Sequence, residues 1–459
     1  MRHTNSLALL LALLGSVSHQ AAAAVNCQGN ITINNAADAS KVRKACSTIG
    51  GNLIIRDTKS IILDGIETVR GSVVNGCARL DDNCDEASLF SISSSTLKAV
   101  GGDIDLSGID RLEKLLLPNL TAVDGEFHLR DLGNLTHLDI TQLERVGSFF
   151  LSAPALEQLD HDGLQSITSP EGRVSISYLG PVESIDSFFK NPIKPISQDF
   201  DMEISVSDLP QVRNLTIGWT YANFLSVSGT NLTVTFGGPK TESMEIGLMF
   251  IHGFGEAVSL RRNSELQNLT VEQAFIDDVT AEGVMLPFDN VTTLGVQSAN
   301  VTAVKLPAEA ENWGNMSMTI DIPSGDLREF DDDDTKIWYW PQEIYYLVLN
   351  ASFENSFFDS FFERNCTSPG KMKVEDRSGR FNCTDLEGRF SSNLPREFAC
   401  RSYNSTPADE SAGDNSTSNG STDGESTDDD DSAAPTTVLW SFQLQVAFAI
   451  AVCLVFTQA

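Results

Sequence analysis

Leucine and other apolar residues recur in fixed columns between Leu97 and Leu143, with an offset of 23 residues. The segment that begins at Leu97 aligns without gaps on the segment that begins at Leu120, and apolar residues then meet in nine columns. The paired residues are Leu97/Leu120, Val100/Val123, Ile104/Phe127, Leu106/Leu129, Ile109/Leu132, Leu112/Leu135, Leu115/Leu138, Leu117/Ile140 and Leu120/Leu143. A period of this length is typical of a solenoid, in which one turn cannot bury its apolar face alone and stacks on its neighbours.

The apolar spacing within one repeat predicts the structure of one turn. Ile104 and Leu106 form one pair of apolar columns two residues apart, and Leu115 and Leu117 form another, whereas the apolar residues between these pairs follow at steps of three. Alternation predicts strands, because successive side chains of a strand point to opposite faces. A repeat of 23 residues with two or three short strands leaves no room for a helix of ordinary length. The predicted fold class is therefore mainly β, a right-handed parallel β-helix that forms a leucine-rich-repeat-like solenoid.

The repeat columns predict the extent of the solenoid and the segments that follow it. They continue over residues 25–325, either as one unit or as two halves, 25–187 and 200–325, separated by a Pro- and Lys-rich loop at Phe188 to Phe200. An open solenoid end exposes apolar core, so we expect residues 326–400 to form a C-terminal cap. The phenylalanines of this segment fall at steps of three and four, which predicts one helix face; a membrane-binding helix is the alternative, disfavoured by its acidic residues. Residues 401–432 are rich in Ser, Thr and Asp and predict a disordered stalk.

The two ends of the chain predict secretion and lipid attachment. Residues 1–24 begin with Arg2, continue with a short apolar run and end in small residues, which is the order of a signal peptide. Residues 433–459 form an apolar segment that follows a long polar stretch, which predicts a glycosylphosphatidylinositol (GPI) attachment signal. Ser432 is the predicted attachment residue, and Asp431 and Gly424 are the alternatives. A retained membrane helix is disfavoured because no basic cluster follows the apolar segment.

Fifteen Asn-x-Ser/Thr sequons agree with a secreted chain. They are Asn30, Asn119, Asn134, Asn214, Asn231, Asn268, Asn290, Asn300, Asn315, Asn350, Asn365, Asn382, Asn404, Asn415 and Asn419. The net charge of −32 argues against nucleic acid as a partner, because a protein must neutralise phosphates to bind it.

The cysteines predict disulfides in an oxidising compartment. Cys27 and Cys46 flank the first coil, and Cys77 and Cys84 close a short loop, so each pair is a predicted disulfide. Cys366, Cys383 and Cys400 cannot all pair with one another. One of these three is expected to be free or to bond to another molecule.

The sequence shows no catalytic or cofactor-binding motif of the common types. GxSxG, HExxH, GxxxxGK[ST] and CxxC are all missing, so we predict no catalytic, cofactor-binding or metal-binding residues. His128, His137, His161 and His252 stand singly and are expected to face outward from the coils. The acidic run Asp331 to Asp334 could hold calcium, but hydrated like charges in a loop are the simpler interpretation.

One outward column of the predicted strands carries no sequon and forms our candidate binding face. The residues in this column are Asp105, His128, Ser175, Ser205, Ser226 and Ser259. A second outward column would contain His137, Asn214, Asn231 and Asn268, and its three asparagines are all sequons. We therefore expect glycans to cover one sheet face and a partner or wall polysaccharide to dock on the other. The alternative is that small residues merely suit a crowded strand surface.

The signal peptide, the Cys27 and Cys46 bracket, repeats such as LPNLTAVDGEFHLRDLGNLTHLDI, and the acidic stalk with its GPI tail resemble a known family. They are similar to fungal GPI-anchored cell-wall organisation proteins related to sporulation-specific wall proteins, whose repeats resemble the receptor L-domain. The resemblance implies a non-enzymatic cell-surface protein, on the outer leaflet of the plasma membrane or in the wall, needed for wall organisation and integrity. The expected partner is wall polysaccharide or mannoprotein, and the membrane is contacted through the GPI lipid alone. A GPI-anchored wall-glycan remodelling enzyme, a glycosidase or transglycosidase, is the alternative; a receptor would need a co-receptor to signal.

Overall fold

The computed structural model describes residues 25–56, 59–76, 89–193, 201–363, 369–389, 395 and 397–403. The predicted signal peptide, Cys77, Cys84, Cys366, the GPI segment with its candidate attachment residues, and the stalk from residue 404 lie outside the described residues. All described residues belong to one compact unit, Met1–Ser405. No helix within them has the length and apolar character needed to cross a membrane.

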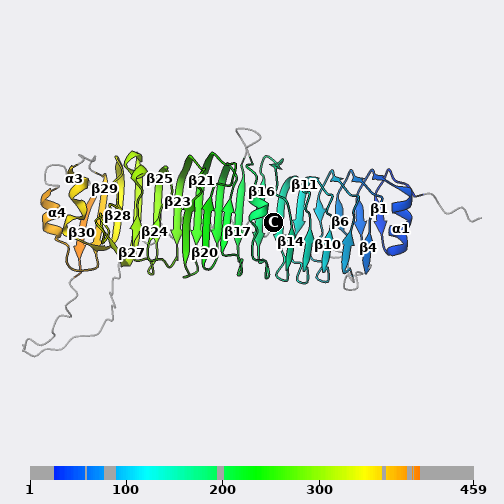
Figure 1. The fold of residues 1–459 in the computed structure, drawn as a ribbon, viewed down its shortest axis with the longest axis horizontal. Helices are drawn as coiled ribbons and strands as arrows, with labels where there is room; N and C mark the ends of the chain where they lie inside the picture. Colours follow the sequence, from blue (N-terminus) through cyan, green and yellow to red (C-terminus); the bar gives the residue numbers. More distant parts are fainter. Residues whose placement is uncertain are drawn as a thin grey trace, which may run out of the picture. The chain divides into compact units, whose positions relative to one another are not determined.

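Parallel strands stack along this unit and confirm the predicted β-solenoid (Figure 1). The sheet that we call the main sheet contains twenty strands among the described residues. These are β1 (Ile31–Ile33), β2 (Thr48–Ile49), β3 (Leu53–Ile55), β5 (Thr68–Val69), β6 (Val73–Asn75), β8 (Ala99–Val100), β9 (Ile104–Asp105), β11 (Ala122–Leu129), β13 (Arg145–Ser152), β15 (Ser166–Ile167), β16 (Arg173–Ser177), β17 (Glu203–Ser207), β19 (Tyr221–Ser228), β21 (Ser243–His252), β23 (Asn268–Asp277), β25 (Asn290–Gln297), β27 (Met316–Leu327), β28 (Ile344–Phe353), β29 (Lys371–Asp376) and β30 (Glu397–Ser402).

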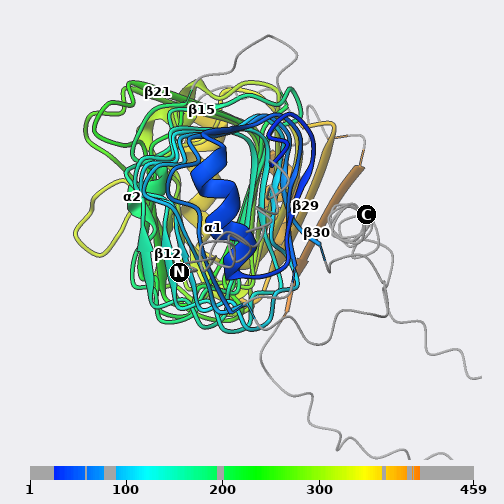
Figure 2. The ribbon, with the colours of Figure 1, turned by 90° about the vertical axis from the view of Figure 1, so that its right-hand side faces the viewer.

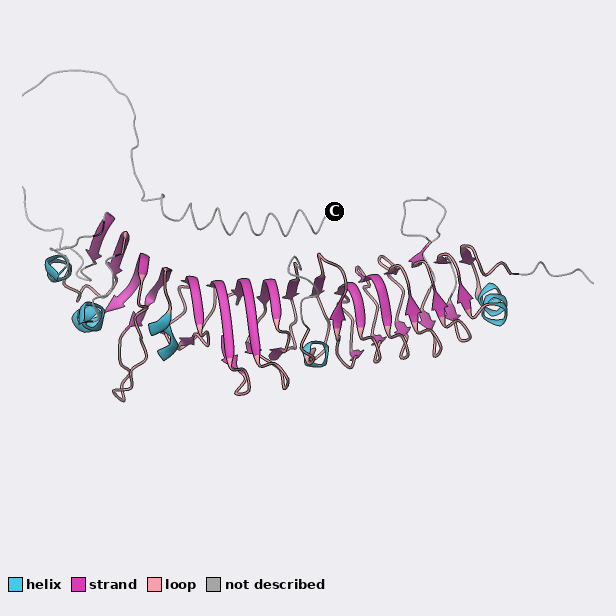
Figure 3. Ribbon diagram, turned by 90° about the horizontal axis from the view of Figure 1, so that it is seen from above, coloured by secondary structure: helices cyan, strands magenta, loops and turns pink. Residues whose placement is uncertain are grey.

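Three smaller sheets form other sides of the coils, and Figure 3 shows the strands arranged in rows. The second sheet contains β4 (Ser60–Ile62), β7 (Ser91–Ser93), β10 (Lys114–Leu116), β12 (His137–Asp139) and β14 (Gln158–Asp160). The third contains β18 (Asn214–Ile217), β20 (Leu232–Phe236) and β22 (Val258–Arg262), and the fourth contains β24 (Val284–Met285) and β26 (Val304–Lys305). The described helices are α1 (Ala36–Ala45), α2 (Asp186–Phe189), α3 (Asp359–Glu363) and α4 (Cys383–Arg389), with 3-10 turns η1 (Ala308–Asn312) and η2 (Asn355–Phe358).

The strand register reproduces the apolar columns of the sequence. Val100 pairs with Val123, Ile104 with Phe127, and Leu115 with Leu138, as the 23-residue offset predicts. Every residue of the nine columns is buried in one continuous core. Each coil therefore places an apolar side chain directly over the equivalent side chain of the next coil.

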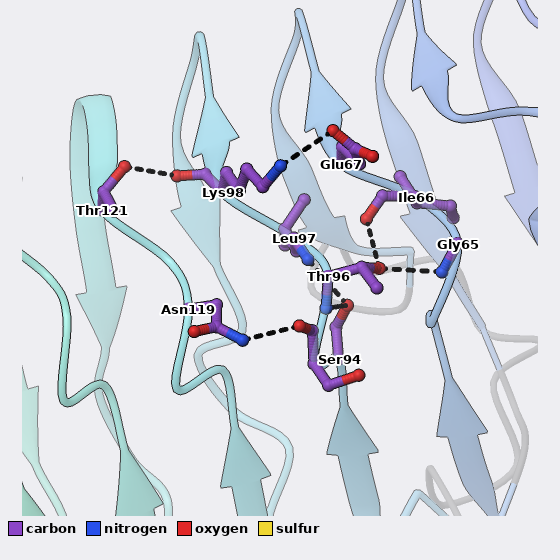
Figure 4. A network of polar contacts seen from close by, with 10 residues as sticks. Gly65, Ile66, Glu67, Ser94, Thr96, Leu97, Lys98, Asn119 and Thr121 are labelled. Atoms are coloured by element: carbon purple, nitrogen blue, oxygen red, sulfur yellow. Dashed lines mark hydrogen bonds and ion pairs between the residues drawn. The ribbon is translucent and has the colours of Figure 1, made fainter.

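Polar side chains join successive coils at their corners (Figure 4). The Thr121 hydroxyl donates to the Lys98 carbonyl at 2.9 Å, and the Asn119 amide donates to the Ser95 carbonyl at 2.7 Å. A second corner, 15 residues further along the chain, has the same two bonds, from Thr136 to Glu113 and from Asn134 to Asp110. The Asn-Leu-Thr triplets that form sequons at Asn119 and Asn134 thus also connect one coil to the one before it.

Helix α1 lies across the N-terminal end of the stack (Figure 2). Its N-cap is Asn35, whose side chain accepts a hydrogen bond from the Asp38 amide, and it buries Ala39 and Val42. Cys27 and Cys46, which precede and follow this helix in the sequence, form a disulfide as predicted. Covering the end of a solenoid in this way keeps the apolar core of the first coil from water.

The main sheet runs without interruption past both predicted boundaries. Strands β16 and β17 pair in register on either side of the predicted loop, and Phe188, Phe189 and Ile193 are buried rather than projecting into solvent. The main sheet also continues beyond residue 325 through β28, β29 and β30. The segment 326–400 therefore adds further coils to the solenoid. Irregular coil lengths hid this continuity, because periodicity detects only coils of constant length.

The C-terminal coils contain an aromatic core. Phe357 contacts the rings of Trp338, Trp340 and Phe353, with ring centroids 5.2 to 5.4 Å apart. The predicted helical phenylalanines lie mostly in η2 and α3, whereas Phe353 ends strand β28. The structure also pairs Cys383 with Cys400, which joins α4 to β30.

Asp376 holds the last described coils together. It is fully buried, and its carboxylate accepts hydrogen bonds from the Ser378 and Ser402 hydroxyls and from the Phe353, Ser378 and Phe381 amides. Burial raises the pKa of Asp376, but these hydrogen bonds lower it more, so the pKa lies below its usual value.

We expect Asp376→Ala to lower the free energy of unfolding by about 3 kcal/mol, because several buried donors would lose their acceptor. Since the pKa is lowered in the folded state, the contribution of Asp376 is complete above its unfolded pKa and is lost as the pH falls below it. Urea unfolding at neutral and acidic pH measures both effects. The control Asp385→Ala removes an exposed carboxylate of the neighbouring helix and should change stability little; equal losses for the two variants would contradict the prediction.

Candidate functional site

Five of the six residues of the predicted binding face lie in one ladder of the main sheet. Asp105 pairs with His128, and Ser175 pairs with Ser205, which pairs with Ser226. Phe150 stands between the two groups, because it pairs with His128 on one side and with Ser175 on the other. The five residues, with Phe150 between them, thus follow one line across six successive main-sheet strands.

Ser259 was predicted wrongly as part of this line. It lies on β22 of the third sheet, where it pairs with Thr233. In the main sheet, the residue that follows Ser226 along the line, on the side away from Ser205, is Phe250. The predicted column of glycosylated asparagines is also wrong: Asn214 lies in the third sheet, Asn231 precedes β20, and Asn268 belongs to the main sheet. Strands of all the sheets alternate with period two, so alternation alone does not show which sheet a strand joins.

Six serines form a flat grid at the centre of the main sheet, which we call the serine grid. It consists of Ser175 and Ser177 on β16, Ser205 and Ser207 on β17, and Ser226 and Ser228 on β19. All six are partly exposed, and none of their hydroxyls bonds to another protein group within the described ranges. Beside the grid, Arg173 and Glu203 form an ion pair at 2.8 Å. The grid therefore offers neutral hydroxyl groups rather than net charge.

Aromatic side chains flank the serine grid on both sides along the solenoid. On one side, the Phe150 ring is buried; it lies 5.0 Å from His128 and is covered by the Arg130 guanidinium at 4.6 Å. On the other side, Phe250 stacks on Phe275 with centroids 5.2 Å apart. Phe224 adds a third ring, 5.8 Å from Phe250. Sequence analysis missed these rings, although Phe150 and Phe250 each follow a residue of the buried column.

The described sequons lie away from the centre of this face. No sequon asparagine lies in main-sheet strands β9, β11, β13, β16, β17, β19 or β21. Ten of the described sequon asparagines are exposed: Asn30, Asn119, Asn134, Asn214, Asn231, Asn268, Asn290, Asn300, Asn315 and Asn382. Asn350 differs because it is half-buried, donates to Asp321 and accepts from Arg377.

The structure corrects one expectation about the isolated histidines. His161 is buried rather than outward-facing, and burial lowers its pKa to about 4, so it is neutral at neutral pH. The other three are partly exposed, and no group of His, Cys, Asp and Glu in the described chain could hold a metal ion. In the acidic run, the Asp331 carboxylate accepts hydrogen bonds from the Asp333 and Thr335 amides, which is the arrangement of a loop.

We expect the two histidines at opposite ends of the face to titrate on opposite sides of pH 6.5. Burial lowers the pKa of His128, and Arg130 lowers it further, whereas a hydrogen bond to Asp277 raises the pKa of His252. Charged His252 therefore stabilises the fold at low pH, and this contribution is lost as the pH rises through its folded pKa. NMR titration of the imidazole resonances shows which of the two histidines loses its proton at the lower pH. Asp277→Asn should bring the pKa of His252 back toward 6.5 and leave the pKa of His128 unchanged. Titration of both histidines at the same pH in the wild type would contradict the assignment.

Comparison with known proteins identifies relatives among fungal wall proteins. No family model and no solved structure matches the chain. The cell wall protein ecm33 of Schizosaccharomyces pombe is 30% identical over 131 residues, which are 27% of this chain and 29% of the relative. The protein ecm33 of Aspergillus fumigatus is 26% identical over 257 residues, which are 50% of this chain and 61% of the relative. The chain thus matches less than two thirds of either relative, and its homologues are the fungal cell wall proteins of the ecm33 type.

Proposed function

We propose that this protein is a GPI-anchored cell-surface glycoprotein that supports fungal wall organisation by binding wall polysaccharide, without catalysing a reaction. The name of the Schizosaccharomyces pombe relative, a cell wall protein, supports a role in the wall. The predicted signal peptide, sequons and GPI signal support a location at the cell surface. The main sheet provides the binding surface in this proposal.

The observation that carries the proposal is the serine grid with the partly exposed rings of Phe250 and Phe275 at one of its ends. A pyranose unit has hydroxyl groups around its edge and apolar C–H groups on its faces. Serine hydroxyls can donate to and accept from the edge hydroxyls, and phenylalanine rings can pack against the C–H faces. A surface that combines both groups on rigid strands suits a polymer of neutral sugars.

Charge favours a neutral polysaccharide over an acidic one. The protein has a net charge of −32, and the cation beside the grid, Arg173, is paired with Glu203. A phosphorylated or carboxylated polymer would therefore be repelled over most of the surface. The absence of sequons in the central strands also leaves this face open to a large ligand.

The alternative, a wall-glycan remodelling enzyme, requires two carboxylates on either side of a sugar bond. Across β16, β17 and β19, the outward residues of the face include one carboxylate, Glu203, and it is held by Arg173. This arrangement suits docking better than hydrolysis.

A binding assay of the full-length protein with insoluble β-glucan, chitin and mannan tests the proposal, with released sugars measured in the same samples. We expect saturable binding to a polysaccharide without release of soluble sugar. Release of sugar by the protein would contradict the non-enzymatic role, and the absence of binding to all three polymers would contradict the docking role.

A glycan introduced into the serine grid should block this binding. Ser205→Asn creates the sequon Asn-Val-Ser at positions 205–207, so a host that glycosylates it places a bulky chain on the face. We expect at least tenfold weaker binding. The matched control Ser91→Asn creates Asn-Ile-Ser on β7 of the second sheet and should bind like the wild type. Equal binding by a fully glycosylated Ser205→Asn protein would show that the grid is not the docking face.

A further inference from the structure

An open groove of about 400 Å³ runs beside the serine grid, along the ends of five main-sheet strands. Its lining includes Pro154 after β13, Tyr178 after β16, Asp208 after β17, Gly229 after β19 and Phe254 after β21. Neighbouring strands lie about 4.8 Å apart, so this row of strand ends extends over roughly 20 Å. Three of the lining residues directly follow grid serines, because Tyr178, Asp208 and Gly229 come after Ser177, Ser207 and Ser228. The groove and the serine grid are therefore adjacent surfaces.

Two exposed aromatic rings belong to this groove. Tyr178 is 60% exposed and Phe254 is 48% exposed, although both carry a large aromatic ring. The Phe254 ring contacts His252 edge to face at 4.5 Å, and His252 is paired with Asp277. Exposing aromatic surface to water is unfavourable, and contiguous exposed apolar groups often mark binding sites.

The backbone beneath these rings is in an unfavourable conformation. Tyr178 and Phe254 both have φ near +49°, in the left-handed region that bulky residues avoid. Other coils place aspartate at this corner: Asp131, Asp208 and Asp278 have φ between 48° and 56°. Aspartate tolerates the left-handed conformation much better than an aromatic residue does. Two of the coils along the groove thus carry rings where the backbone favours a small polar residue, and such strain is common at ligand-binding positions.

We propose that this groove is a subsite for a linear neutral hexose polymer, with Tyr178 and Phe254 packing against the faces of sugar rings. The inference rests on the proposed polysaccharide-binding function and names where the polymer is held most tightly. The equal spacing of the strand ends suits a ligand with a regular repeat. Asp208 is the single charged residue of the lining and is acidic, so nothing in the groove attracts an anionic sugar. Polar groups of the adjacent grid are then in reach of the hydroxyls of the same chain.

Replacing both rings by asparagine tests the subsite without adding backbone strain. Asparagine accepts the left-handed conformation, as Asn231 and Asn315 show in this protein, so Tyr178→Asn and Phe254→Asn should keep the melting temperature. Neither substitution creates a sequon. We expect the double variant of the full-length protein to bind a soluble linear β-glucan hexasaccharide at least tenfold more weakly in calorimetry. The ring-conserving variants Tyr178→Phe and Phe254→Tyr should bind within about threefold of the wild type.

A matched control and the polymer assay separate the two proposals. Phe330→Asn removes a phenylalanine that is also 48% exposed but lies outside the groove lining. The affinity of this variant for the hexasaccharide should equal that of the wild type. If the double variant keeps wild-type affinity while a glycan at Ser205 abolishes binding to polymer, the groove is not a subsite and the proposed function stands. If the wild type binds neither the hexasaccharide nor any of the three polymers, both proposals fail. Loss of affinity in the ring-conserving variants equal to that of the asparagine variants would also overturn the packing role of the rings.

Discussion

Parallel hydrogen bonding between successive coils is the constraint on which the rest of this structure depends. Each coil offers backbone amides and carbonyls along both of its edges, and these groups must pair with a coil above and a coil below. Pairing in register brings equivalent side chains together, so Ile104 meets Phe127 and Leu115 meets Leu138. A single coil can bury neither its apolar column nor its polar backbone, and stability is therefore shared along the stack. The side-chain bonds from Thr121 and Asn119 to the preceding coil fix the same register at the corners.

Among the described residues, the first and last coils each lack one neighbouring coil, and the contacts that replace it differ between the two ends. At the N-terminal end, α1 covers the core and the Cys27–Cys46 disulfide brackets it. Towards the C-terminal end, the buried Asp376 carboxylate accepts hydrogen bonds from the Phe353 and Phe381 amides and the Ser402 hydroxyl, and Cys383–Cys400 holds α4 against the last described strand. A tightly packed aromatic group around Phe357 fills the space between these elements. Both ends thus replace missing coil contacts by short-range connections.

The same register also builds the outer surface. Because inward residues stack, the outward residues between them stack too, and identical residues in neighbouring coils become a continuous strip of one chemistry. The serine grid arises in this way from three strands that each carry two outward serines. The aromatic groups at its ends arise from coils in which the equivalent positions are Phe150, Phe250 and Phe275. A repetitive surface of this kind suits a repetitive ligand, and sequons are missing from the strands that form it.

The sequence by itself determined the class of fold and the register of its best coils, because buried residues must recur at a fixed spacing when coils of equal length stack. It also indicated Asp105, His128, Ser175, Ser205 and Ser226 as one outward line, which the strand pairing reproduces. Only the tertiary structure decided that Ser259 belongs to a different sheet, that His161 is buried and that residues beyond 325 continue the solenoid. It also decided that Tyr178 and Phe254 line one groove, although 76 positions separate them in the chain. The physical reason is that alternation shows which side of a strand faces inward, whereas the sheet that a strand joins depends on turn geometry and coil length.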